Sequence, residues 1–163
     1  METITKNIPA LALRGLTVFP RMTASFDVER EISVRALERA METGQEIFLV
    51  TQRELGVELP EEKDLYEVGT VARVIQILRA SNSMMRVVME GGSRARLRRL
   101  WQREPFLQAQ VELIGEEKSP RHGTRTEAML RQTYALFGEY SELTNKLPES
   151  IFTTVMDATD PGF

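Results

Sequence analysis

The sequence has no cysteine, and this absence excludes disulfides, thiol nucleophiles and thiolate metal sites together. Its one histidine, His122, has no second histidine nearby, so we interpret it as a solvated loop residue rather than a metal ligand or catalytic group. No apolar run approaches the ~20 residues that a membrane-spanning helix needs, and residues 1–6 lack the basic and apolar segments of a secretory signal. We therefore expect a soluble, cytoplasmic protein that holds no metal.

Motifs of enzyme chemistry are also missing. There is no G-x-x-x-x-G-K-[ST] phosphate loop that could cradle ATP. Lys118 and Ser119 are adjacent, but activation of a serine requires a buried lysine, and this pair has the composition of an ordinary surface. The acidic cluster Glu61, Glu62 and Asp64 lacks the spacing of a calcium loop, so a solvated acidic turn is the favoured interpretation. We expect no catalytic residue and no cofactor in this chain.

What the sequence does have is the composition of an ordinary globular protein. Its 163 residues are enough for one domain, or for one compact domain and the start of another. The formal net charge of −3 argues against a surface built as a whole to neutralise phosphates.

The first part of the chain predicts short strands and one helix. Residues 8–13 alternate as a strand, and Pro9 lies early in it, where an edge strand tolerates proline. A second strand is expected around residues 26–28. Residues 31–42 repeat apolar side chains at helical spacing, and Gly44 is placed to end this helix in the left-handed conformation.

Four further strand patterns follow, and together they predict a small, curled α+β module. Residues 47–50 are a short apolar run of the buried-strand type. Residues 69–78 and 84–90 are joined by a predicted hairpin turn at 80–83, and Gly91-Gly92 is expected to break the second of these strands. A phase slip of the apolar residues around Arg98-Arg99 suggests a bulge, and a last strand is expected over residues 106–114.

The composition changes at residues 115–123, which we interpret as a linker. The next four residues, Thr124 to Glu127, have the spacing of a capping box, and a helix is expected from there to about Leu143. Pro148 suits the first turn of a second helix. We therefore predict a β-rich lobe over residues 1–116, and a linker with the first helices of an incomplete helical subdomain over residues 117–163.

Arg94, Arg96 and Arg98 recur with a period of two, so they are expected to share one face of a strand. A basic stripe of this kind is the best nucleic-acid signal in the sequence. Glu90 and Glu104 flank it, however, and RNA-binding modules usually combine a basic groove with several aromatic platforms. A solvated strand face is the favoured interpretation, and an RNA-binding module remains the alternative.

Several segments within about the first 115 residues form a recognisable pattern through their order and spacing. They are Ile8-Pro9-Ala10-Leu11-Ala12-Leu13-Arg14-Gly15, Phe19-Pro20, Glu29-Arg30-Glu31-Ile32-Ser33, Ile47-Phe48-Leu49-Val50-Thr51-Gln52, Asp64-Leu65-Tyr66-Glu67-Val68-Gly69-Thr70-Val71-Ala72 and Glu90-Gly91 through Arg94-Ala95. This pattern resembles the N-terminal region of Lon-type ATP-dependent proteases, and Asp160-Pro161-Gly162 fits the helical continuation of that family.

This resemblance implies a PUA-like β-rich lobe followed by helices, from a homo-hexameric serine protease. The ATPase domain, which would bind ATP and Mg²⁺, and the Ser-Lys protease domain would lie C-terminal to residue 163. Related lobes occur in cereblon-type and free-standing Lon-substrate-binding-like proteins, and the helical tail favours Lon. The implied role is recognition of unfolded or damaged proteins, with support of hexamer assembly.

Two apolar segments are candidate substrate-binding residues. Met84 and Met85 lie beside a predicted turn, where strand alternation turns one residue of an adjacent pair away from the core. Phe19, Pro20 and Met22 form an apolar loop. Flexible methionine side chains suit the binding of unrelated unfolded segments, although a methionine near a hairpin end also commonly fills the core.

Because the phosphate loop and an activated nucleophile are missing, we expect this chain neither to hydrolyse ATP nor to cleave casein-like substrates. A coupled ATPase assay and a labelled-casein assay on the repurified chain test this. Saturable ATP binding together with activity that survives repurification would contradict it.

Overall fold

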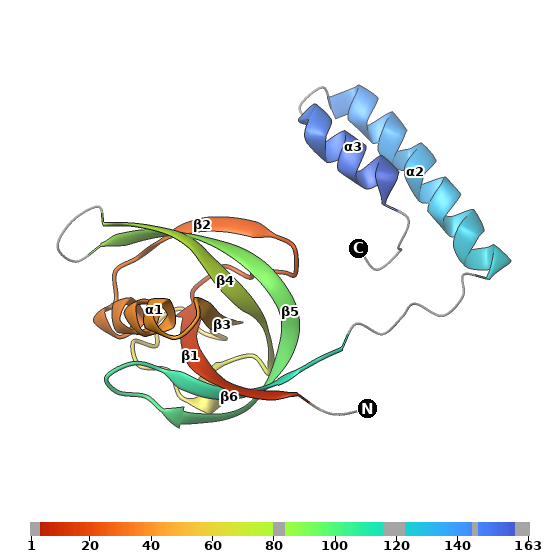
Figure 1. Cartoon of the computed structure of the whole chain (residues 1–163). Helices are drawn as coiled ribbons and strands as arrows, with labels where there is room; N and C mark the ends of the chain where they lie inside the picture. Colours follow the sequence, from red (N-terminus) through yellow and green to blue (C-terminus); the bar gives the residue numbers. More distant parts are fainter. Residues whose placement is uncertain (1–3, 80–83, 116–122, 145–146, 159–163) are drawn as a thin grey trace. The chain divides into compact units, whose positions relative to one another are not determined.

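The computed structural model describes residues 4–79, 84–115, 123–144 and 147–158 of the chain. The chain forms two compact units, residues 1–116 and 117–163 (Figure 1). Among the described residues, the first unit contains six strands, one α-helix and a short 3₁₀ helix, and the second contains two α-helices. In chain order the elements are β1 (Thr5–Leu13), β2 (Thr23–Val28), α1 (Glu31–Glu42), β3 (Glu46–Thr51), η1 (Glu62–Asp64), β4 (Val68–Arg79), β5 (Met85–Gln102), β6 (Gln108–Leu113), α2 (Thr124–Thr144) and α3 (Glu149–Asp157).

The six strands form one mixed sheet in the order β2-β5-β4-β3-β1-β6. Only β1 and β3 run parallel, and every other pair of strands is antiparallel. β5 is 18 residues long. Its residues 85–90 pair with β2 and its residues 95–102 pair with β6. β4 pairs with the other edge of β5. The sheet is therefore strongly curled, as Figure 1 shows. The predicted α+β lobe with one helix is confirmed.

The lobe has two apolar clusters because β1 and β3 are buried on both faces. Leu11 and Leu49 belong to one cluster with the buried face of α1, which is made by Ala36, Leu37 and Ala40. On the other face, Ala10, Ala12, Phe48 and Val50 of the same strands belong to the second cluster. The unbroken apolar runs of these strands follow from this double burial.

The helix of this lobe has the predicted bounds, residues 31–42. After Thr43, Gly44 has φ +100°, so the prediction that it ends the helix in the left-handed region is confirmed. The amide of Gln45 donates to the carbonyl oxygen of Ala40 at 2.8 Å. This bond closes the helix immediately before β3 begins.

Pro9 does not lie in an edge strand, so that expectation was wrong. β1 pairs with β6 along Thr5–Pro9 and with β3 only from Ala10 onward. The amide of Ala10 donates to the carbonyl oxygen of Leu107, just before β6, at 2.8 Å. The nitrogen of Pro9 therefore faces the opposite edge of β1, where pairing with β3 starts only at Ala10. An interior strand accommodates the missing N–H at this change of partner.

Gly91-Gly92 does not break the strand, contrary to the prediction, because β5 runs through both residues. Each glycine instead permits another backbone to approach closely. A Cβ atom on Gly91 would overlap the carbonyl oxygen of Phe19, and one on Gly92 would lie 2.7 Å from the carbonyl oxygen of Val71. The predicted bulge is confirmed by a register shift between Leu97 and Arg99.

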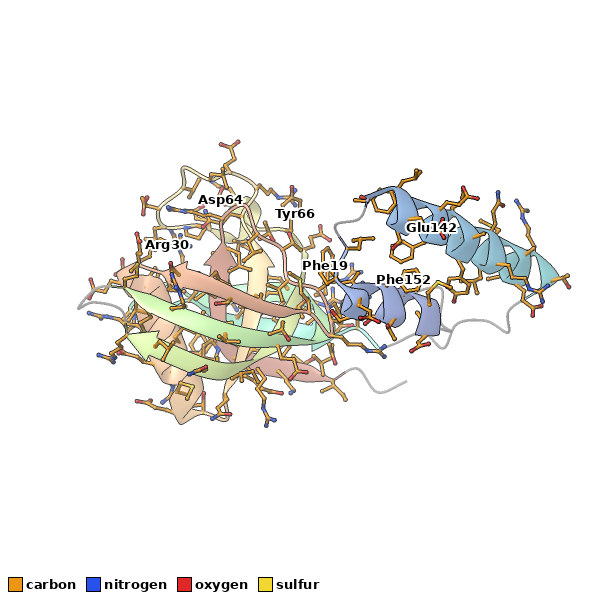
Figure 2. All side chains as sticks on the ribbon, turned by 90° about the horizontal axis from the view of Figure 1, so that it is seen from above. Phe19, Arg30, Asp64, Tyr66, Glu142 and Phe152 are labelled. Carbon is orange, nitrogen blue, oxygen red and sulfur yellow. The ribbon has the colours of Figure 1, made fainter. Side chains whose placement is uncertain are left out.

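The second unit consists of α2 and α3. The Phe137 and Phe152 rings stack with their centroids 6.0 Å apart, and the Tyr134 hydroxyl donates to the carbonyl oxygen of Ala158; Figure 2 labels Phe152 on α3. Thr124 is already helical, and the Glu127 amide bonds to the carbonyl oxygen of Gly123, so the predicted capping box, with Thr124 as the N-cap, is wrong. No described residue of either helix is buried. Most of the predicted linker lies outside the described residues.

We expect Gly91→Ala to lower the free energy of unfolding by about 1–3 kcal/mol, because the added methyl would overlap a backbone carbonyl that cannot rotate away. Urea unfolding of the chain measures this change. Gly56→Ala is the matched control, since nothing lies within 4 Å of a Cβ at that position. Equal stability of the two variants would show that the Phe19 loop can shift without cost.

Candidate functional site

The candidate loop residues Phe19, Pro20 and Met22 form a tight turn just before β2. The Met22 amide donates to the carbonyl oxygen of Phe19 at 3.2 Å, and Arg21 between them has φ +63°. Proline at the second position and a positive φ at the third are the features of a type II β-turn. The sequence Phe-Pro-Arg-Met therefore folds locally into a protrusion rather than a strand.

This turn is held in place by backbone contacts on both sides. The Thr70 hydroxyl, which is buried, donates to the carbonyl oxygen of Val18 at 2.7 Å. On the other side, Gly91 accepts from the Arg21 amide at 2.7 Å and donates to Met22 at 2.8 Å. The anchor residue Val18 is itself only 3% exposed. The position of the turn is thus fixed independently of its own side chains.

The side chains of the turn project outward from this fixed backbone. Phe19 is 56% exposed and Met22 is 37% exposed, while Pro20 is half-buried. Figure 2 shows Phe19 at the surface of the lobe. The turn thus exposes two large apolar side chains to solvent.

The two methionines of the other candidate segment have different environments. Met85 is 5% exposed, belongs to the main core cluster and lies opposite Val28 of β2. Met84 is half-buried at the end of the hairpin. As strand alternation requires, only one of the adjacent pair faces the core. Met85 is therefore a core residue and not a surface contact, which corrects its place in the candidate site.

Two exposed apolar residues of the same hairpin were missed by the sequence argument. Ile75 is 55% exposed and Leu78 is 51% exposed on the predicted strand of residues 69–78. A register shift between Val74 and Gln76 changes the phase of β4. The Gln76 between them, polar in an apolar run, was the only signal of this shift.

The acidic cluster of residues 61–64 caps the 3₁₀ helix η1. The Asp64 carboxylate accepts from the Glu61 amide at 2.8 Å, Glu61 pairs with Lys63 and Arg103, and Glu62 accepts from the Leu100 amide at 3.0 Å. These carboxylates therefore bond to separate protein groups. Among the described residues there is no group of three or more carboxylates or histidines that could hold a metal.

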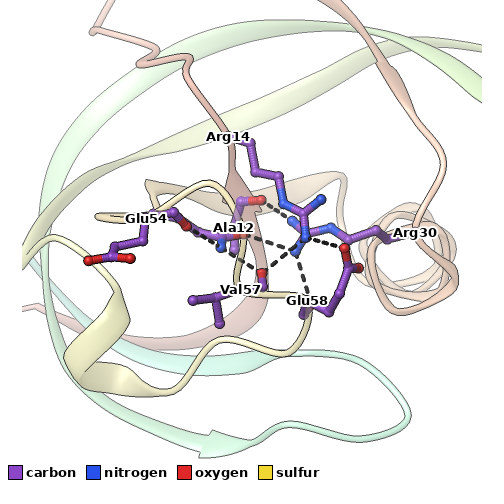
Figure 3. Close-up of polar contacts among 7 residues, drawn as sticks. Ala12, Arg14, Arg30, Glu54, Val57 and Glu58 are labelled. Carbon is purple, nitrogen blue, oxygen red and sulfur yellow. Dashed lines mark hydrogen bonds and ion pairs between the residues drawn. The ribbon is translucent and has the colours of Figure 1, made fainter.

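A polar cluster around Arg30 binds the segment after β3 to the lobe (Figure 3). The Arg30 guanidinium donates to the carbonyl oxygens of Ala12 and of Glu58 and to the Gln52 side chain. Burial lowers the pKa of Arg30 from its ordinary value, the nearby Arg14 charge lowers it further, and Glu58 opposes both. The side-chain amide of Gln52, which is 2% exposed, donates to the carbonyl oxygens of Glu54 and Val57.

This cluster is structural because its polar groups bond to one another. Arg14 completes it by donating to the carbonyl oxygen of Val57 and by pairing with Glu58, each at 3.0 Å. Gln52 is the buried member of the cluster, and a buried polar group must be paired or it costs free energy. The arrangement leaves no nucleophile or general base poised for chemistry in this part of the lobe.

The predicted basic stripe exists, but two of its three arginines lie next to carboxylates. Arg94, Arg96 and Arg98 all lie exposed on β5. Arg96 lies 4.0 Å from Glu67, and Arg98 pairs with Glu112. Neighbouring carboxylates reduce the positive potential that phosphate binding needs. The geometry supports the solvated-face interpretation.

An open groove of about 580 Å³ lies on the lobe. It lies between the start of α1 and the turn joining β5 to β6. Ile32, Leu59 and Pro105 supply its apolar lining, and Glu31, Arg35 and Glu104 border it. A mixed apolar and charged lining in a shallow groove offers no enclosed pocket for a small cofactor.

Residues 7–162 match the family model described as the ATP-dependent protease La (LON) substrate-binding domain. The chain belongs to this family, which confirms the resemblance seen in the sequence. It is 38% identical over 157 residues to a Lon protease of Brevibacillus choshinensis, covering 96% of this chain and 20% of that protein. It is 35% identical over 161 residues to Lon protease 1 of Bacillus subtilis strain 168, covering 99% of this chain and 20% of that protein. The chain thus spans about a fifth of the length of these curated relatives.

Solved structures agree on the fold. The N-terminal domain of the Mycobacterium avium complex Lon protease matches with a TM-score of 0.71 at 17% identity, covering 96% of this chain and 77% of that one. A Lon N-terminal domain protein from Xanthomonas campestris matches with a TM-score of 0.55 at 17% identity, covering 96% and 92%. No helix in the described part of the chain is long and apolar enough to cross a membrane.

The different burial of the two methionines gives a paired test. Met85→Ser should lower the free energy of unfolding by about 2–5 kcal/mol, because it leaves a cavity and a hydroxyl in the core. Met84→Ser should lower the free energy of unfolding by less than about 1 kcal/mol, because Met84 is only half-buried. Urea unfolding of both variants measures the difference. Equal losses would contradict the assignment of only Met85 to the core.

Proposed function

We propose that this chain recognises unfolded or damaged protein segments on behalf of a cytoplasmic ATP-dependent Lon serine protease, and that it supports assembly of that protease as a homo-hexamer. The family supplies substrate binding as the general role. In this proposal, ATP hydrolysis with Mg²⁺ and peptide cleavage belong to the remaining length of the parent. The chain itself performs no chemistry.

The observation that carries the proposal is the exposed apolar turn on a rigid support. Phe19 and Met22 remain in water although the backbone beneath them is fixed to Thr70 and Gly91. A fixed backbone reduces the entropy lost when a partner binds. Unfolded segments share exposed apolar side chains and little else, so an apolar contact with an adaptable methionine suits many sequences.

The outer face of the β4–β5 hairpin carries further exposed apolar side chains. Leu78 is exposed there, and Val88 of β5 is half-buried on the same face. Leu78 lies opposite Arg86, whose charge is paired with Asp27. Apolar side chains interspersed with neutralised charges favour weak, sequence-tolerant contacts over recognition of a single motif.

An RNA-binding role is the competing hypothesis. Two arginines of the basic stripe have carboxylate partners, and the described lobe has no stacking platform of paired aromatic rings. Salt dependence distinguishes the two hypotheses, because phosphate binding weakens steeply with salt whereas apolar capture of a peptide does not.

We expect Phe19→Ser combined with Met22→Ser to weaken binding of a permanently unfolded protein about tenfold, because the apolar area that the probe would cover is lost. Fluorescence anisotropy with labelled, reduced and carboxymethylated α-lactalbumin measures the affinity, at low and at moderate salt. Both side chains are exposed, so the melting temperature should change little.

Met41→Ser is the matched control for this experiment, because Met41 is 41% exposed on α1, close to the exposure of Met22. It should bind the unfolded probe as the unchanged chain does. Equal weakening by both variants would indicate unspecific apolar adhesion. Unchanged affinity of the double variant would remove the turn from the binding surface.

A further inference from the structure

Among the described strands, β2 is the one with a single partner strand. Within the described part of the chain, β1, β3, β4, β5 and β6 each pair with at least two other strands, whereas β2 pairs only with β5. No other backbone hydrogen bond of residues 23–28 is found among the described residues. Figure 1 shows β2 at the margin of the lobe, with β5 along one side of it. The outer edge of β2 thus presents a row of backbone groups to solvent.

The register identifies the residues that provide these groups. Gly91 of β5 donates to the carbonyl oxygen of Met22, and the pairing continues with Ala24 opposite Met89 and Phe26 opposite Val87. In an antiparallel pair, alternate residues direct their backbone N–H and C=O groups to the partner strand and away from it. Thr23, Ser25 and Asp27 therefore direct theirs to the free edge.

Features that usually block an edge are missing on β2. The strand Thr23–Val28 contains no proline and no lysine, which are the residues that natural proteins use to prevent pairing of edges. Its outward-facing Thr23 and Ser25 are small. The only charge, on Asp27, is held by two hydrogen bonds from Arg86 at 2.7 and 2.9 Å. The edge is therefore open to another backbone.

We propose that the free edge of β2 accepts an extended segment of unfolded polypeptide as an additional strand, so that substrates are held by backbone hydrogen bonds to Thr23, Ser25 and Asp27. This inference rests on the proposed function and assigns it a chemical mechanism. Every unfolded polypeptide carries the same N–H and C=O groups, so a sheet edge binds it without reading its sequence.

The position of the apolar turn supports this occupant. Met22 immediately precedes β2, and Phe19 lies at the other end of the same turn. A segment that continues along the edge beyond Thr23 would reach these exposed side chains, which are 37% and 56% exposed. Backbone pairing along the strand and apolar contact at its end would then act on one continuous segment.

Ser25→Pro tests the edge directly in the whole chain. Because the Ser25 amide faces away from β5, proline removes no bond of the existing sheet, but it deletes one donor and places a ring on the edge. We expect roughly tenfold weaker binding of labelled, reduced and carboxymethylated α-lactalbumin. Ser25→Thr is the matched control, because it keeps the amide and the preference for strand, and it should bind like the unchanged chain.

Amide hydrogen exchange of the unchanged chain, followed by NMR, gives a second measurement that does not depend on the folding of a variant. Bound probe should slow exchange at Thr23, Ser25 and Asp27, whereas the amides of Ala24 and Phe26 should exchange slowly with or without it. Binding of the probe with unchanged exchange at the outward amides, and with full affinity of Ser25→Pro, would overturn the edge proposal and leave the proposed function standing.

Two other outcomes would also overturn the edge proposal. Absence of any probe binding to the unchanged chain would remove the proposed function together with this inference. Slowed exchange at the same three amides as the concentration of the chain rises, without probe, would assign the edge to a second copy of the chain.

Discussion

The close approach of two backbones at Gly91 is the constraint on which the lobe depends. β5 must run the whole length of the lobe to pair with β2, β4 and β6, and the turn before β2 must cross it at the point where β5 has no side chain. Hydrogen bonds in both directions between Gly91 and the turn then set the register of β2. The exposed turn and the free edge of the sheet are both consequences of this crossing.

The sequence predicted the elements of this lobe well where a single physical cause determined the pattern. The face of α1 follows from apolar residues at helical spacing, and its end follows from Gly44, which lacks the side chain that would oppose a positive φ. The bulge at Arg98-Arg99 was visible because it displaced the apolar phase of a long strand. Local chemistry was sufficient in each of these cases.

Errors arose where a distant part of the chain decided the outcome. Gly91-Gly92 looked like a strand break, because the loop that requires a small residue there is some 70 positions earlier in the sequence, at Phe19. Pro9 looked like an edge residue, because the change of partner along β1 depends on both β3 and β6. For the candidate site, alternation predicted that one of Met84 and Met85 is inward, but only the pairing of β5 with β2 determines which.

Both kinds of contact proposed here discriminate weakly between sequences, and this follows from the chemistry that the lobe exposes. Its half-buried cation, Arg30, is occupied by carbonyl oxygens and Gln52, and Arg96 and Arg98 of β5 have carboxylate partners, so these three charges are already engaged within the lobe. What remains at the margin of the lobe is apolar area and backbone polarity, which every unfolded polypeptide can match and which a folded protein keeps covered. A lobe that binds in this way would distinguish unfolded proteins from folded ones, and it would distinguish little between one unfolded sequence and another.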